Sequence, residues 1–314
     1  MQGTTDATRK ALTAGSMLPG DDHSGAENVA RVERLLTAEQ WAFLVPRANA
    51  IYTRDAFLKA VGRYASFCGN NGSDPDTMCK RELATLLANW AQETGSASDT
   101  YKDSDGNPVP HWRQGLYFLE ENYCIKGGKG YGSDACKYYQ PGWSEKANAW
   151  PPQEPERYYG RGPFQLSWNY NYGRFSNVFA TTGGKDTRMV LLKDPSKLIK
   201  DGYTSFASAL WFYMTPRTPK PSMHQVVTGD WVPNATDSGA GITAGFGAVI
   251  NIINGGIECR SDAKPNGKKE AQNRVDYYTA LLEYFKLPAE QNMSCAGMKD
   301  FPQGGSGTQN MYLD

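Results

Sequence analysis

The stretch YYGRGPFQLSWNYNYG, residues 158–173, is the most distinctive run in this 314-residue chain. Amide and hydroxyl side chains occupy every second position from Gln165 to Asn171, and aromatic or aliphatic side chains fill the positions between. Alternate side chains of an extended segment point to opposite sides, so this pattern predicts one polar and one apolar face. Amides donate and accept hydrogen bonds, and such a face can bind a ligand rich in hydroxyl and amide groups. The alternative is an edge strand whose polar face meets only water.

Helical periodicity dominates the sequence around this stretch. Thr37 and Gln40 have the spacing of a capping box, and Asp55 is placed to cap a helix whose apolar stripe begins at Phe57. Further helices are expected over about 79–94, 201–214 and 269–286, with loops over 69–78, 96–115 and 124–157. Strand signals are short and weak, so a mainly α-helical fold follows.

The domain organisation is simple. Residues 1–34 are small, polar and without pattern, which is typical of a disordered tail or linker. Residues 35–314 are expected to form one domain with long loops, and long loops often carry functional residues.

Composition narrows the class of protein. Lys plus Arg and Asp plus Glu both total 33, which argues against nucleic acid or an anionic membrane as a partner. No apolar stretch reaches the roughly 18 residues of a membrane span, and a signal peptide, if the protein is secreted, is not part of this chain. Six cysteines predict three disulfides and an oxidising compartment, with the pairing open; unpaired buried thiols are the alternative. The histidines are scattered and no CxxC occurs, so no metal site is expected.

Two groups of carboxylates are candidates for acid–base chemistry. Glu93 follows Leu86 by seven residues and Trp90 by three, which puts it on the apolar face near the end of the helix over 79–94. Burial and the negative end of the helix dipole would both raise its pKa, as a general acid requires. A frayed last turn with a solvated glutamate is the alternative. Glu120 and Glu121 are adjacent, so at most one should face a given site.

The run at 158–173 resembles the signature of family 19 chitinases. AQETG at 91–95 is similar to the segment that carries this family's acid, and GFGAVINIINGGIEC at 245–259 is similar to its C-terminal signature. WFYMTPRTPKPSMH at 211–224 resembles a fourth block, and the four blocks occur in the family's order. The resemblance covers about residues 36–295 and is closer to secreted bacterial members than to plant ones.

The resemblance implies a lysozyme-like, two-lobed fold with a long substrate cleft. It implies an endo-acting, secreted and monomeric enzyme without cofactor or metal, which hydrolyses β-1,4-linked N-acetylglucosamine polymers with inversion. Glu93 falls on the general acid, Glu121 on the general base six residues after Gly115, and Ser167 on the residue that holds the attacking water. The expected substrate contacts are Gln165, Tyr170, Asn171, Lys220 and Asn254. Glu258 and Arg274 fall on a supporting charged group.

This sequence departs from the family pattern at two positions: Gln92 replaces the usual histidine before the acid, and Arg217 replaces a glutamine of plant members. Among the cysteines, the resemblance implies Cys259–Cys295 and Cys124–Cys136 bridges. We also predict a Cys68–Cys79 bridge, which has no clear counterpart in the family.

Three other functions fit parts of the pattern. A cell-wall hydrolase acting on peptidoglycan would keep the catalysis and change the substrate, and fold alone does not decide between the two. An inactive chitin-binding lectin would not need both Glu93 and Glu121. A purely structural domain leaves the clustered polar residues unexplained.

Overall fold

The computed structural model describes residues 26–139, 149–179 and 190–307. Within these ranges the chain is mainly helical, and strand pairing is limited to isolated bridges. The α-helices are α2 (Glu27–Leu35), α3 (Ala38–Leu44), α4 (Arg54–Val61), α5 (Pro75–Thr94), α7 (Asn169–Phe179), α8 (Val190–Lys193), α9 (Gly202–Met214), α10 (Met223–Thr228), α11 (Ala235–Gly239), α12 (Phe246–Glu258) and α13 (Pro265–Tyr284). Three short 3₁₀ turns, His111–Arg113, Asp134–Cys136 and Pro195–Ile199, lie in the connections.

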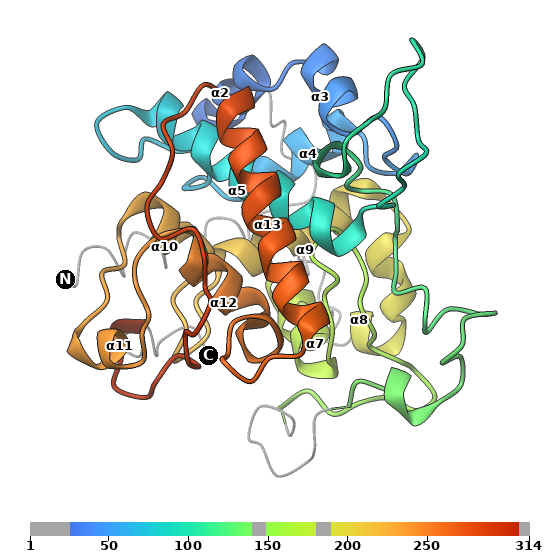
Figure 1. Cartoon of the computed structure of the whole chain (residues 1–314). Coiled ribbons are helices and arrows are strands. Elements are labelled where there is room, and N and C mark those ends of the chain that lie inside the picture. The colour runs from blue at the N-terminus through green and yellow to red at the C-terminus, as the bar shows by residue number, and fades with distance from the viewer. Residues whose placement is uncertain (1–25, 140–148, 180–189, 308–314) are drawn as a thin grey trace.

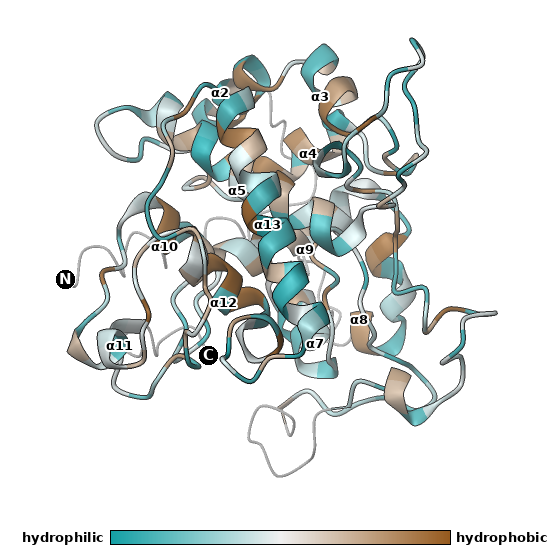
Figure 2. Ribbon diagram, viewed as in Figure 1, coloured by the Kyte–Doolittle hydropathy of each residue, from teal (hydrophilic) through white to brown (hydrophobic). Residues whose placement is uncertain are grey.

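Helices α5 and α13 form the centre of the molecule. They make the most extensive helix pairing, and α13 crosses in front of α5 in Figure 1. Figure 2 shows α13 largely hydrophilic on the face toward the viewer, while α12 beside it is strongly hydrophobic. Asp74 caps α5 by accepting a hydrogen bond from the Thr77 backbone N–H, and Pro75 takes the first helical position. Both features stabilise the start of α5.

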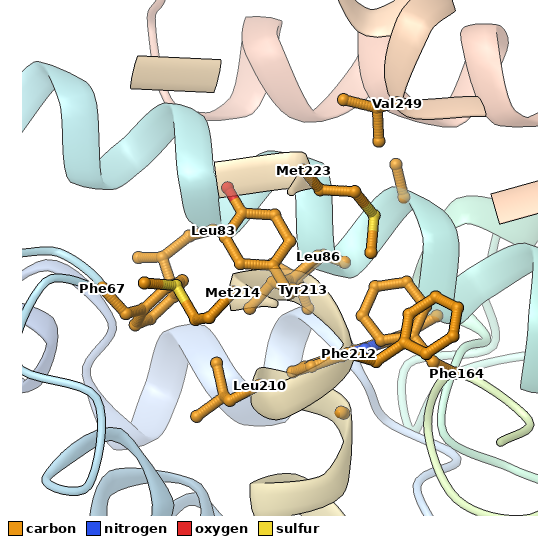
Figure 3. Close-up of a cluster of buried hydrophobic side chains, with 14 of the residues drawn as sticks. Phe67, Leu83, Leu86, Phe164, Leu210, Phe212, Tyr213, Met214, Met223 and Val249 are labelled. Atoms are coloured by element: carbon orange, nitrogen blue, oxygen red, sulfur yellow. The ribbon is translucent and has the colours of Figure 1, made fainter. Parts of the chain in front are cut away.

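An aromatic core fixes α5 against α4 and α9. The rings of Phe57, Trp90 and Phe206 lie 5.3–5.6 Å apart between centroids. Figure 3 shows the neighbouring cluster, in which Leu83 and Leu86 of α5 pack near Leu210, Phe212, Tyr213 and Met214 of α9. Buried aromatic side chains contribute several kcal/mol each, roughly 3–5 on truncation to alanine. This packing determines where the last turn of α5 lies.

The predicted helices are present, but several begin at a different residue or have a different cap from the one predicted. The capping box of Thr37 and Gln40 is present. Helix α4 is capped by Thr53, and Asp55 lies in its first turn, so Asp55 as the cap was wrong. Helices α5 and α13 each begin four residues earlier than predicted, at a proline whose fixed φ suits the first turn.

The prediction of an extended segment over 158–173 was wrong. The backbone turns at Gln165 and Trp168, whose φ angles are +47° and +77°, and α7 begins at Asn169. Two left-handed residues break an extended chain, so the polar and aromatic side chains are not sorted onto opposite faces.

The boundary at residue 34 also needs correction. Helix α2 lies within the segment predicted to be a tail, and its Val29 and Val32 are buried in the core. The Asn28 side chain donates to the backbone carbonyls of residues 61, 64 and 67, which ties α2 to the end of α4. Residues 1–25 of the predicted tail lie outside the described part of the chain.

All three predicted disulfides are present: Cys68–Cys79, Cys124–Cys136 and Cys259–Cys295. In the described ranges, every helix is too short or too polar to cross a membrane.

Candidate active site

A polar cleft of about 820 Å³ lies where the end of α5 meets α7, α12 and α13. The cleft is lined by nine of the ten residues that the sequence singled out: Glu93, Glu121, Gln165, Ser167, Tyr170, Asn171, Lys220, Asn254 and Arg274. The tenth, Glu258, lies directly behind this lining and bonds to Asn254 and Arg274. Segments more than 150 residues apart in sequence therefore meet at one site.

Glu93 occupies the last turn of α5, and only 15% of its side chain is exposed. Its Oε1 accepts a hydrogen bond from Arg274 Nη2 at 2.5 Å. Burial raises the pKa of the Glu93 carboxyl; Arg274 opposes this effect, and the nearby Glu258 carboxylate adds to it. A carboxyl that keeps its proton in this way can donate it to a leaving group.

A buried ion pair supports Glu93 from behind. Arg274 binds Glu258 through two hydrogen bonds of 2.8 and 2.9 Å, and its third nitrogen donates to Asn89 Oδ1. Both charged side chains are almost completely buried. The planar guanidinium thus joins α5, α12 and α13 and fixes the direction of the Glu93 carboxyl.

The structure separates the two adjacent glutamates. Glu121 lines the cleft; its carboxylate accepts a hydrogen bond from the Gly160 backbone N–H at 3.4 Å, and it interacts electrostatically with the Tyr138 hydroxyl. Glu120 is directed away from the cleft lining, where Tyr159 donates to it at 3.0 Å and Arg161 pairs with it at 3.3 Å. Glu120 therefore already has partners within the protein.

The polar residues of the 158–173 run form a hydrogen-bonded edge of the cleft. Ser167 Oγ donates to the Gln165 carbonyl at 2.9 Å, and Asn171 Nδ2 donates to the Ser167 carbonyl at 2.9 Å. Asn171 Oδ1 is buried, and it has no hydrogen-bond partner within the described residues. A buried acceptor without a partner is costly unless a ligand or water satisfies it.

Lys220 lines the cleft from the segment between α9 and α10. Its ammonium donates to the backbone carbonyls of Asn251 and Ile252. Burial, with a contribution from Arg217, lowers the pKa of Lys220 to about 8. Arg217 itself stacks 3.5 Å above the Phe212 ring, and Gln92, the other departure from the family pattern, accepts a hydrogen bond from Asn273 of α13.

Several cleft residues were missed by sequence reasoning: Tyr138, Trp168, Arg174, Ile257 and Glu270. Trp168 is an aromatic residue next to amides, a pattern that could have marked it as a cleft residue. The predicted extended segment, however, placed its side chain on the face opposite the amides. Tyr138 and Glu270 reach the cleft only through the fold, and no local pattern marks either. For metals, the described residues contain no cluster of three or more His, Cys, Asp or Glu side chains that could hold an ion.

A mainly helical fold with a polar cleft that two glutamates face is the arrangement of a glycoside hydrolase. Residues 44–295 match the family model described as "Chitinase class I". The chain belongs to this family of glycoside hydrolases, and it is an enzyme of that class.

Individual relatives agree with the family assignment. "Chitinase 3" of Oryza sativa subsp. japonica is 35% identical over 255 residues, which cover 81% of this chain and 69% of the rice protein. "Basic endochitinase" of Vitis vinifera is 33% identical over 261 residues, covering 82% and 70%.

Solved structures confirm the predicted mainly helical, lysozyme-like fold. A class IV chitinase from Zea mays superposes with a TM-score of 0.56 at 24% identity, covering 84% of this chain and 100% of the maize chain. Chitinase C from Streptomyces griseus gives a TM-score of 0.55 at 25% identity, covering 83% and 80%.

Proposed function

We propose that this protein is an endo-acting chitinase, which hydrolyses the β-1,4 bonds between N-acetylglucosamine units by inverting single displacement. Glu93 donates a proton to the glycosidic oxygen, while Glu121 takes a proton from the water that attacks the anomeric carbon. The new C–O bond forms as the old one breaks, so the product carries the opposite anomeric configuration. Ser167 helps to hold the attacking water.

The observation that carries this proposal is the contrast between the two carboxyls that line one cleft. Glu93 is buried and its pKa is raised, which suits an acid. Glu121 lines the same cleft, and its carboxylate accepts a hydrogen bond from the Gly160 backbone N–H, so we assign it as the base. No cofactor takes part in this mechanism.

The remaining cleft residues suit an N-acetylated sugar chain. Gln165, Asn171 and Asn254 supply amides, and Lys220 supplies a donor. Tyr170 adds an aromatic surface of the kind that packs against a sugar ring. We infer that these residues bind the substrate, with Glu258 and Arg274 holding the cleft wall.

We further propose that the enzyme works as a secreted monomer. Three disulfides in the described chain support an oxidising compartment, because such bonds are rarely kept in a reducing cytosol.

The test is a comparison of two substrates with the purified protein. We expect rapid release of reducing ends from chitohexaose and slow or no release from purified peptidoglycan. The opposite order would identify the protein as a cell-wall hydrolase. Tight binding of chitohexaose without any cleavage would identify it as a lectin, and either result would overturn the proposal.

A further inference from the structure

Glu270 is a carboxylate in the cleft that the proposed mechanism does not use. It lines the cleft from α13, one helical turn before Arg274, on the same face of the helix. The side chain is half-buried. Within the described residues, Glu270 makes no hydrogen bond or ion pair, although its carboxyl group interacts electrostatically with Glu93, Glu258 and Arg274.

A half-buried carboxylate without a donor lacks part of the hydration that it has in water. The pKa of Glu270 is raised by this burial and by the carboxylates of Glu258 and Glu93, and Arg274 only partly opposes the effect. A ligand that brings a donor or a positive charge would restore the lost stabilisation.

The charges around this part of the cleft do not balance. Among the described residues, Glu93, Glu258 and Glu270 all interact electrostatically with one cation, Arg274, whose hydrogen bonds go to Glu93, Glu258 and Asn89. When Glu93 carries its proton as the acid, Arg274 compensates one of the two remaining carboxylates. One negative charge, at Glu270, is then left facing the cleft.

Basic residues lie elsewhere along the lining. Arg174 belongs to α7, and Arg217 and Lys220 belong to the segment between α9 and α10. The cleft therefore presents an anionic wall beside the acid and cationic side chains on other elements. A positively charged sugar unit would be attracted to the first and repelled by the second.

We propose that Glu270 is a specificity-determining residue, which lets the cleft accept a glucosamine unit, the cationic deacetylated form of the substrate, next to Glu93. The Glu270 carboxylate accepts a hydrogen bond from the C2 ammonium, or from a hydroxyl or amide N–H when the unit is acetylated. Partly deacetylated chitin is then cleaved with glucosamine tolerated at one position relative to the broken bond. This inference rests on the proposed chitinase activity.

The test compares Glu270→Gln with wild type on chitohexaose and on partly deacetylated chitin, at a pH where the amine is charged. Gln keeps the shape and a hydrogen-bonding oxygen but removes the charge. We expect the ratio of kcat/KM for the deacetylated polymer to kcat/KM for chitohexaose to fall about tenfold, because a hydrogen bond between charged partners is worth that much more than a neutral one. Mass spectrometry of the products should show the glucosamine preference lost at one position.

Glu283→Gln is the matched control, because Glu283 is an exposed glutamate at the C-terminal end of the same helix and does not line the cleft. It should keep the wild-type ratio and product pattern. Added salt should weaken the wild-type preference and leave the Glu270→Gln ratio nearly constant.

Two results would overturn the inference: an unchanged ratio in Glu270→Gln, or an equal loss on both substrates, which would make Glu270 a general hydrogen-bond acceptor. Failure of the wild type to cleave chitohexaose at all would instead contradict the proposed function, so the two failures are distinct.

Discussion

The Glu93 carboxyl is held between opposing influences. Burial favours its protonated form, and the Arg274 guanidinium favours its ionised form. The pKa is raised, so burial is the stronger effect. A carboxyl in this position is useful to a general acid and unfavourable for the stability of the fold above its pKa.

This balance predicts a pH-dependent stability difference between Glu93→Gln and wild type. In the unfolded chain a glutamate ionises near about pH 4.3. In the folded wild type Glu93 keeps its proton to higher pH, so wild-type stability falls as the pH rises between the two pKa values. The glutamine does not titrate, so its free energy of unfolding should improve relative to wild type across this window. Urea unfolding of both proteins at acidic and neutral pH measures this difference in free energy of unfolding. If wild type instead became more stable relative to Glu93→Gln as the pH rises, the prediction would be contradicted.

The assignment of Glu121 as the base predicts that substitutions at the adjacent residues Glu120 and Glu121 have very different effects on kcat. Glu93→Gln and Glu121→Gln should each lower kcat at least about a hundredfold, since the first lacks the proton donor and the second cannot accept a proton from water. Glu120→Gln should stay within about tenfold in rate, because its partners are Tyr159 and Arg161 rather than the cleft.

Assays of the three variants on chitohexaose provide the measurement, and calorimetric binding is the control. Oligomer affinity should survive in both catalytic variants, because the amides of the cleft remain. An inactive Glu120→Gln beside an active Glu121→Gln would move the base to Glu120.

At the scale of elements, helix α2 shows why a short amphipathic segment was missed. Two of its buried residues are polar: Asn28, and Arg31, which donates to the backbone carbonyls of Cys68 and Gly69. These side chains satisfy carbonyls in the turns after α4, which a count of apolar positions does not reveal.

We predict that Asn28→Ala lowers the free energy of unfolding by about 1–3 kcal/mol, because the Phe67 carbonyl loses its donor, while the carbonyls of Val61 and Tyr64 each keep one backbone donor. Glu33→Ala, an exposed change on the same helix, is the control and should alter stability by less than about 0.5 kcal/mol. Equal, small effects of both changes in chemical denaturation would show that α2 adds little to the fold.

The loop closed by the Cys124–Cys136 disulfide lies next to the proposed base, Glu121. Glu121 lies three residues before its first cysteine, and Tyr138, which interacts electrostatically with Glu121, lies two residues after its second. The bridge therefore shortens the path between the proposed base and Tyr138.

Replacing both cysteines by serine should lower the free energy of unfolding by about 2–3 kcal/mol, as a loop of this length predicts. We also expect kcat on chitohexaose to fall well below what the unfolded fraction explains. The same double change at Cys68 and Cys79 is the control, and it should cost stability without a specific loss of kcat. Identical kcat values for the two folded variants would contradict a role for the bridge in positioning Glu121.

For the molecule as a whole, the sequence and its family resemblance predicted the helical class, the three disulfides and nine of the residues that line the cleft. Glu93 was accessible to sequence reasoning because the helical period of α5 places it on the buried face. The arrangement of residues 158–173 could not be predicted in this way. Their alternating polar and apolar side chains are typical of an extended segment, but two residues with positive φ turn the backbone. Glu270 could not be predicted either, because the pairing of α13 with α5 alone brings it to the cleft.

The central claim is that Glu93 and Glu121 act on opposite faces of the sugar in a single displacement. The most direct measurement is proton NMR on freshly hydrolysed chitohexaose, recorded before the anomers equilibrate. The proposed mechanism predicts that the α-anomer of the new reducing end appears first from the β-linked substrate. A β-anomer at the earliest times would show retention and contradict the assignment of Glu121 as a base that activates water.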